Sequence, residues 1–210
     1  MALDLEEQEK LDALKAWWKQ YGNLVLLVVV AAALAIAGTQ GWRYYQRTQA
    51  LQASNLYDAL ARAVQADDAK AMRDAGGALA ESYPRTLYAS MGALVSARHY
   101  FDRHDLKNAK AQLQWVIERS PSEEFRDLAR LRLAAVLLDE NAYDEALKVL
   151  EAKYAEAFAA QVAALKGDVL VAKNQAAQAR LAYQLALDKA DKRNSAFRDS
   201  VRLRLEALGG

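Results

Sequence analysis

The two histidines of this chain are the side chains best suited to acid–base catalysis or metal binding at neutral pH. His99 and His104 stand five positions apart and flank a predicted turn after Phe101. Paired histidine ligands on one helix are spaced by about four residues, so this pair does not place two ligands on one helix face. We interpret both histidines as surface residues at the end of a helix.

The remaining residue types offer no catalytic arrangement. The chain has no cysteine, and therefore no thiolate nucleophile, disulfide or cysteine metal site. The acidic pairs Asp67-Asp68, Glu123-Glu124 and Asp144-Glu145 lie at predicted helix starts, where negative charge suits the helix dipole. Gly76-Gly77 lacks the Lys-Ser/Thr and the preceding strand of a phosphate-binding loop. We expect no catalytic residue, metal or cofactor; a hydrolase is the alternative, and it would need a pocket of convergent polar groups.

A single long apolar segment near the start of the chain is the element that most constrains its location. Residues 23–42 are uncharged and number about 20, which as a helix spans the roughly 30 Å of a bilayer core. Aromatic residues typical of membrane interfaces flank the segment on both sides: Trp17, Trp18, Tyr21, Trp42, Tyr44 and Tyr45. The sequence predicts an N-terminal segment over 1–22, a transmembrane anchor over 23–42 and one domain over 43–210.

A cleaved signal peptide is the alternative interpretation of this segment. Ala35-Ile36-Ala37 before Gly38 resembles a cleavage site. The region before the apolar run, however, is long and mixes acidic with basic residues, whereas a signal peptide begins with a short basic region. We therefore favour a retained anchor.

The charges beside the anchor favour one orientation weakly. Lys10, Lys15 and Lys19 precede it, and Arg43 and Arg47 follow it. Because basic residues are enriched on the cytoplasmic side, this slight excess favours a cytoplasmic N-terminus and a large domain on the other side. A scaffold whose domain faces the cytoplasm is the alternative.

One face of the anchor is made of small residues. Ala33, Ala37 and Gly41 recur at a spacing of four, so they share a helix face. Small residues allow another transmembrane helix to approach closely. We expect this face to contact a membrane partner, although alanine is also simply tolerated in lipid.

Composition indicates that the domain beyond the anchor is entirely helical. The chain has 210 residues, a net charge of +1 and only two prolines, and strong helix formers dominate it. No basic patch is present that would attract nucleic acid. We predict an all-α domain with breaks at the following positions: Asp67-Asp68, Tyr83-Pro84, His104-Asp105, Ser120-Pro121, Glu140-Asn141, Lys153-Tyr154, Asn174-Gln175 and 191–195.

These breaks pair the helices into a degenerate repeat. Ala109, Ala146 and Ala179 lie 37 and 33 residues apart at equivalent positions, close to the tetratricopeptide repeat of about 34 residues. We predict three such helix pairs, a weaker pair before them over 51–83, and a capping helix over 195–208 that covers the end of the stack. An irregular helical bundle is the alternative.

The first helices of such pairs line a concave surface that holds peptides or partner helices. We predict that this groove is lined by Met91, Leu94, Arg98, Phe101, Leu128, Leu131, Ala135, Leu138, Gln161, Ala164, Asp168 and Val171. About half of the apolar members are expected to fill the core instead. Arg98 is the most telling, because a charge midway along an apolar helix indicates an open groove.

Short motifs spread over nearly the whole chain suggest a family. They are Gly41-Trp42-Arg43-Tyr44-Tyr45, Tyr88-Ala89-Ser90, Leu113-Gln114, Leu131-Arg132-Leu133-Ala134 and Gly167-Asp168. With the single anchor and the helical repeats, they resemble the YfgM family of ancillary SecYEG translocon subunits.

The resemblance implies a bacterial inner-membrane protein with a cytoplasmic N-terminus and a periplasmic tetratricopeptide-like domain. It also implies association with the SecYEG translocon and with the membrane-anchored periplasmic chaperone PpiD. The implied function is non-catalytic, and consists of passing emerging secretory proteins to periplasmic chaperones.

Overall fold

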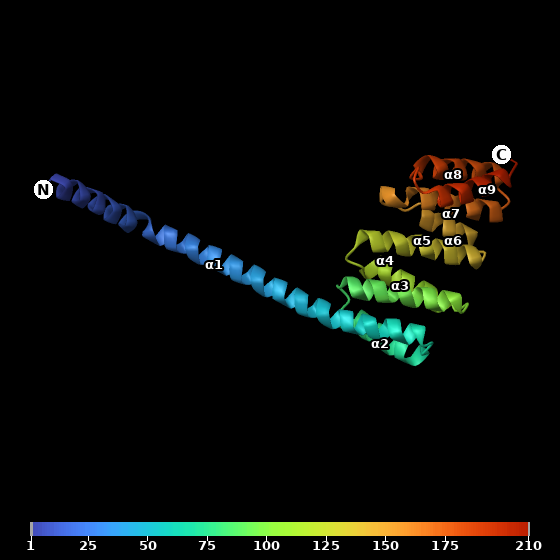
Figure 1. Cartoon of the computed structure of the whole chain (residues 1–210), viewed down its shortest axis with the longest axis horizontal. Coiled ribbons are helices and arrows are strands. Elements are labelled where there is room, and N and C mark those ends of the chain that lie inside the picture. The colour runs from blue at the N-terminus through green and yellow to red at the C-terminus, as the bar shows by residue number, and fades with distance from the viewer. Residues whose placement is uncertain (1, 210) are drawn as a thin grey trace. The chain divides into compact units, whose positions relative to one another are not determined.

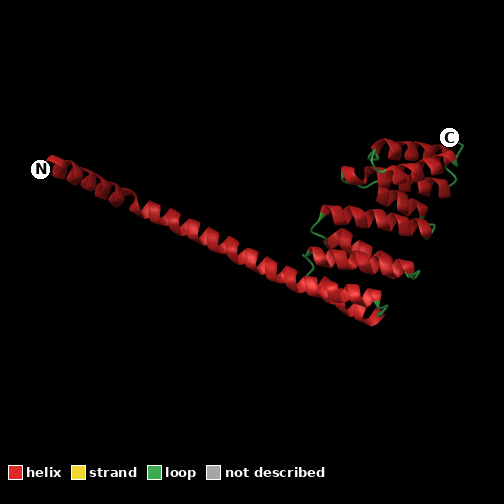
Figure 2. Ribbon diagram, viewed as in Figure 1, coloured by secondary structure: helices red, strands yellow, loops and turns green. Residues whose placement is uncertain are grey.

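The computed structural model describes residues 2–209, and this part of the chain is helical without a strand (Figures 1 and 2). The elements are α1 (Ala2–Gln65), α2 (Ala69–Ser82), α3 (Leu87–Asp102), α4 (Leu106–Arg119), α5 (Glu123–Asp139), α6 (Tyr143–Leu150), the short 3₁₀ helix η1 (Glu156–Phe158), α7 (Ala159–Ala172), α8 (Ala176–Lys189) and α9 (Ser195–Glu206). The predicted all-α fold is confirmed, and the breaks fall where the sequence placed them.

The contacts divide the chain into two units, and the division lies within α1. One unit ends at Thr48 and the other begins at Gln49, beyond the expected end of the anchor at Trp42. Within Glu9–Gln65 the described chain contains a stretch long and apolar enough to cross a membrane, of which only 6% is buried in the structure. The apolar side chains of this stretch have no protein partner to cover them, as an anchor in lipid requires.

The two helices of each pair are joined by turns that are built alike. Asp67, His104, Asn141 and Asn174 have positive φ angles of 59°, 58°, 61° and 60°. In each turn this residue donates its N–H to the carbonyl three positions back, and the next N–H reaches five positions back, as Ala142 does to Leu137. These paired bonds close the helix end as a Schellman motif. The turn within each helix pair therefore has the same backbone conformation, which is structural evidence for the repeat.

Small buried residues allow the paired helices to approach each other. Ala109, Ala146 and Ala179 are fully buried, as their predicted role at the helix crossings requires. In the first pair the equivalent position is occupied by the buried Met72. Between α7 and α8 a glycine permits the approach, because a Cβ on Gly167 would lie within 3 Å of the Tyr183 ring.

The end of the stack is covered by α9. Val201 is buried, and Phe197, Leu205 and Leu208 pack with it against the cluster formed by α7 and α8. The predicted capping helix is therefore confirmed, and it covers the last helix pair through one apolar face. Arg198 adds a polar tie, because its guanidinium donates to the carbonyl of Leu187 over 2.7 Å.

Candidate protein-binding surface

The predicted groove residues lie at equivalent positions of α3, α5 and α7, but they are not equally exposed. Leu94 and Ala164 are buried, with 5% and 4% of their surface exposed, and so belong to the core. A second set is partly buried and packs against the core: Phe101, Leu128, Leu131 and Leu138. Most of each of these side chains packs against the core, so they form the floor of the surface and leave little area for contact with a partner.

A shallow hollow opens where α1 and α3 lie side by side. Its volume is about 470 Å³, and it is lined by Tyr57, Val64, Met91, Leu94, Val95, Arg98, His99, Asp102 and Arg132. Three predicted groove residues, Met91, Leu94 and Arg98, therefore meet at one site. Most of the lining is apolar, and its charged side chains are Arg98 and Asp102 of α3 and Arg132 of α5.

Arg98 is exposed at this hollow, as predicted. Its Nε donates to Oδ2 of Asp102, one turn further along α3, over 2.8 Å. The hydrogen bond and the charge of Asp102 raise the pKa of the Arg98 guanidinium. Because 71% of the Arg98 side chain and 49% of the Asp102 side chain are exposed, water screens this pair and leaves both groups accessible.

Arg132 of α5 is a second cation at the same site, and the sequence analysis did not assign it to the groove. Partial burial and the positive charge of Arg98 lower the pKa of its guanidinium. Among the side chains that the structure describes, Glu7 and residues 9–209, Arg132 has no carboxylate partner. The signal was present in the sequence, because Arg132 interrupts the apolar run between Leu131 and Leu133.

Below the two arginines lies a smaller and more enclosed pocket of about 140 Å³. We call it the arginine pocket; it is lined by Ala97, Arg98, Phe101, Leu113, Arg132, Ala135 and Val136. Apart from the two guanidinium groups, its lining is apolar. Phe101 and Ala135, both predicted groove residues, contribute to its wall.

Asp168 lies at the equivalent position of α7, but its carboxylate is already bonded within the chain. Its Oδ1 accepts a hydrogen bond from the Tyr183 hydroxyl over 2.8 Å, and Arg204 of α9 donates to its Oδ2 over 2.7 Å. These bonds tie the capping helix to the last repeat. The structure therefore brings Arg98 and Phe101 together at one site but leaves Asp168 in a separate network.

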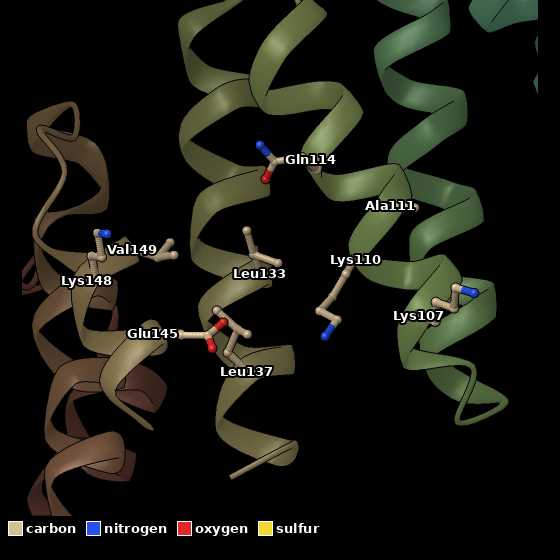
Figure 3. Close-up of a pocket in the computed structure, with 9 residues that line it drawn as sticks. All are labelled: Lys107, Lys110, Ala111, Gln114, Leu133, Leu137, Glu145, Lys148 and Val149. Carbon is tan, nitrogen blue, oxygen red and sulfur yellow. The ribbon is translucent and has the colours of Figure 1, made fainter. Parts of the chain in front are cut away.

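A third hollow lies between α4 and α6, with α5 as its floor. We call it the lysine-lined hollow; its volume is about 640 Å³, and it is lined by Lys107, Lys110, Ala111, Gln114, Leu133, Leu137, Glu145, Lys148 and Val149. Lys110 and Glu145 extend toward each other across Leu137 (Figure 3). Lys110 also pairs with Glu140. The lining therefore brings three lysines together with one carboxylate of its own, Glu145.

One of the two histidines is placed differently from the prediction: His104 is exposed at the end of α3, as expected, whereas His99 is not. His99 was expected at the surface, but only 9% of its side chain is exposed, because the turn between α1 and α2 packs against α3. Its Nε2 lies 3.8 Å from Oδ1 of Asp67, which also pairs with Arg103. His104 lies in the turn between α3 and α4 and adopts the left-handed conformation. Within the described chain no group of three or more His, Cys, Asp or Glu side chains could hold a metal.

The predicted membrane-partner face is open along the anchor. Ala33, Ala37 and Gly41 are exposed, and a Cβ placed on Gly41 would meet no atom within 4 Å. On the preceding turns, Trp17 and Trp18 are about half exposed, as interfacial aromatics are in a membrane protein.

Comparison with known proteins agrees with this architecture. A family model described as a tetratricopeptide repeat-like domain matches residues 15–210. A protein of Neisseria gonorrhoeae is 32% identical over 99% of this chain and 100% of its own length, and one of Haemophilus influenzae is 33% identical over 89% of this chain and 91% of its own. Each carries the name ancillary SecYEG translocon subunit. The chain belongs to this family.

The same family name is carried by a protein of Escherichia coli that is 29% identical over 85% of each chain. No solved structure matches the chain. The resemblance to ancillary translocon subunits inferred from scattered motifs is therefore confirmed along most of the chain, including the anchor and the repeats.

Proposed function

We propose that this protein is a membrane-anchored scaffold at the Sec translocon that binds segments of emerging polypeptides on the concave face of its repeats. The observation that carries the proposal is the open hollow along α1, α3 and α5, where apolar floor residues meet two accessible guanidinium groups. Such a surface suits a polypeptide segment. Its apolar side chains can pack on the apolar floor, and its backbone carbonyls can accept hydrogen bonds from the guanidinium groups. The names of the relatives support placement at SecYEG.

In the same proposal the repeat domain lies in the periplasm and transfers its clients to periplasmic chaperones, PpiD among them. Support comes from the slight excess of lysine before the anchor and from the family resemblance. Protease added to spheroplasts should digest the repeats and leave a small membrane-bound N-terminal fragment. A protected domain would instead indicate a cytoplasm-facing scaffold, and a mature chain that begins at Gly38 would indicate a cleaved signal peptide.

Site-specific crosslinking tests the binding site directly. A photoreactive residue at Met91, in the hollow between α1 and α3, should crosslink to a stalled secretory chain that occupies the translocon. The matched control is the same group at Lys148, in the lysine-lined hollow. Crosslinks that are equally strong from Lys148, or absent from Met91, would contradict a concave binding face.

The anchor is proposed to contact a transmembrane helix of its partner through Ala33, Ala37 and Gly41. Replacing Ala37 and Gly41 by leucine would block close approach, because both positions are open in this chain. We expect weaker co-purification with SecYEG while the repeats stay folded. As a control, Val28→Leu and Val30→Leu change the size of lipid-exposed residues elsewhere on the anchor. Unchanged co-purification of the Ala37→Leu/Gly41→Leu variant would place the contact in the repeats.

A further inference from the structure

The arginine pocket combines two features that occur together at few places in the described chain. One is a partly enclosed, mainly apolar space of about 140 Å³ formed by α3, α4 and α5. The other is a pair of guanidinium groups, Arg98 and Arg132, at its wall. A dry cavity of about 150 Å³ holds a molecule the size of benzene, so the space is suited to one aliphatic side chain.

The charges at this pocket are not balanced within the chain. Arg98 and Arg132 repel each other, and Asp102 is the carboxylate that pairs with Arg98. Arg132 has no such partner among the side chains described in the structure, Glu7 and residues 9–209. The lysine-lined hollow differs in that a carboxylate, Glu145, is part of its lining and a second, Glu140, pairs with Lys110. A carboxylate brought to the arginine pocket would relieve the repulsion and gain charge-assisted hydrogen bonds from planar, preorganised donors.

We propose that the arginine pocket recognises an acidic side chain directly next to an aliphatic residue, in a segment of a partner polypeptide whose backbone turns at this pair; in a fully extended strand neighbouring side chains would point to opposite faces. The aliphatic side chain enters the space beside Phe101 and Leu113, and the carboxylate lies between Arg98 and Arg132. The segment crosses the pocket and does not end there, because the larger hollow continues toward Tyr57 on one side and α7 extends the row of first helices on the other. This inference deepens the proposed function, on which it rests.

Binding of short peptides to the full chain in detergent micelles tests the preference. Three labelled peptides of about ten residues, with a Ser/Gly background, carry Leu-Glu, Leu-Gln or Ala-Glu at their centre. Fluorescence anisotropy should show Leu-Glu bound about tenfold more tightly than either of the others, since each lacks one half of the recognised pair. Equal affinity for Leu-Glu and Leu-Gln would overturn the proposal.

The location is tested with substitutions that remove one charge each. Arg132→Met should lower the affinity for Leu-Glu to that for Leu-Gln and leave Leu-Gln unchanged. The matched control, Lys148→Met, removes a cation from the lysine-lined hollow and should change neither. If Lys148→Met weakens Leu-Glu as much as Arg132→Met does, the attraction is not specific to the arginine pocket and the proposal fails.

A gain of affinity offers an independent test. Asp102→Asn removes the carboxylate that competes for Arg98, so Leu-Glu should bind about twofold more tightly while Leu-Gln does not change.

A peptide that ends in Leu with a free carboxylate, compared with its amide, distinguishes a chain terminus from an internal acidic residue. A preference for the free terminus over internal Leu-Glu would overturn the assignment.

These results separate this inference from the proposed function. If Leu-Gln binds and Met91 crosslinks to secretory chains, but no peptide shows a charge preference, the concave face binds polypeptide and only the pocket assignment is wrong. If no peptide binds and Met91 gives no crosslink, both proposals fail.

Discussion

A Cβ atom on Gly167 would lie 2.3 Å from Cε1 of Tyr183, so α7 and α8 meet at a distance that only glycine permits. Tyr183 is itself 2% exposed, and its hydroxyl is bonded to Asp168. The ring therefore cannot move aside without breaking that bond. This tight contact between α7 and α8 and the network that holds the capping helix therefore share one side chain, Tyr183.

Gly167→Ala should destabilise the chain for this reason. Overpacking of a buried contact costs about 1–3 kcal/mol, and we expect a lower midpoint in a thermal unfolding curve followed by circular dichroism. Gly77→Ala is the matched control, because a Cβ there meets no atom within 4 Å. In that helix interior alanine should stabilise by about 0.5–1 kcal/mol. The same sign for both substitutions would contradict the close contact.

Local features of this fold were predictable from the sequence, whereas long-range pairings were not. Local backbone geometry sets the turns, as at His104 and Asn141, and the helix crossings require small residues, as at Ala109 and Ala146. Both features recur at the spacing of the repeat and are therefore visible in the sequence. The pairing of Asp168 with Arg204 has no such trace, because 36 positions separate the partners.

The candidate site was predictable in part for the same reason. Arg98 was identified because it breaks an apolar helix face. Arg132 breaks one too, but it lies off the equivalent position of the repeat, and its role depends on how α5 packs against α3. Burial of Leu94 likewise depends on the neighbouring helices, which the periodicity of its own helix does not describe.

The left-handed turn at Asn174 can be tested by two substitutions. Its φ of 60° is strained for alanine and free for glycine. Asn174→Ala should therefore be less stable than Asn174→Gly by about 1 kcal/mol in urea unfolding. Equal stability of the two variants would show that the turn does not hold this conformation in solution.

Asp127 fixes the segment between α6 and α7 to α5. Its carboxylate is 1% exposed, and it accepts hydrogen bonds from the Ala155 backbone N–H over 2.8 Å and from Arg130 over 2.7 Å. Asp127→Asn removes the charge and should cost about 3 kcal/mol, because a buried partner is left unpaired. The exposed Asp139 of the same helix is the control: Asp139→Asn should stay within about 0.5 kcal/mol of the parent chain. Similar losses from both would argue against the buried network.

Alkaline pH should destabilise the repeats through their buried tyrosines. Burial raises the pKa of Tyr154 to about 12, and burial together with the Asp168 hydrogen bond raises that of Tyr183 further. In the unfolded chain these groups lose their proton near pH 10. Between pH 10 and 12 the unfolded state therefore binds fewer protons, and stability falls as the pH rises. The fall should be shallower in Tyr154→Phe; an identical pH dependence in that variant would contradict the assignment.

Phe101 and Arg98 should separate stability from binding, although they line the same pocket. Phe101 is partly buried against the core, so Phe101→Ala should lower the midpoint of thermal unfolding, by analogy with large-to-small core changes of about 3 kcal/mol. Arg98 is mostly exposed and paired only with the exposed Asp102, so Arg98→Ala should leave the unfolding curve unchanged. In the Leu-Glu peptide assay, Arg98→Ala should lose about tenfold in affinity. Phe101→Leu fills more of the core than Phe101→Ala. It should therefore restore more of the thermal stability than of the peptide affinity. An Arg98→Ala variant that binds as well as the parent chain would remove this arginine from the site, and one that unfolds earlier would show that its role is structural.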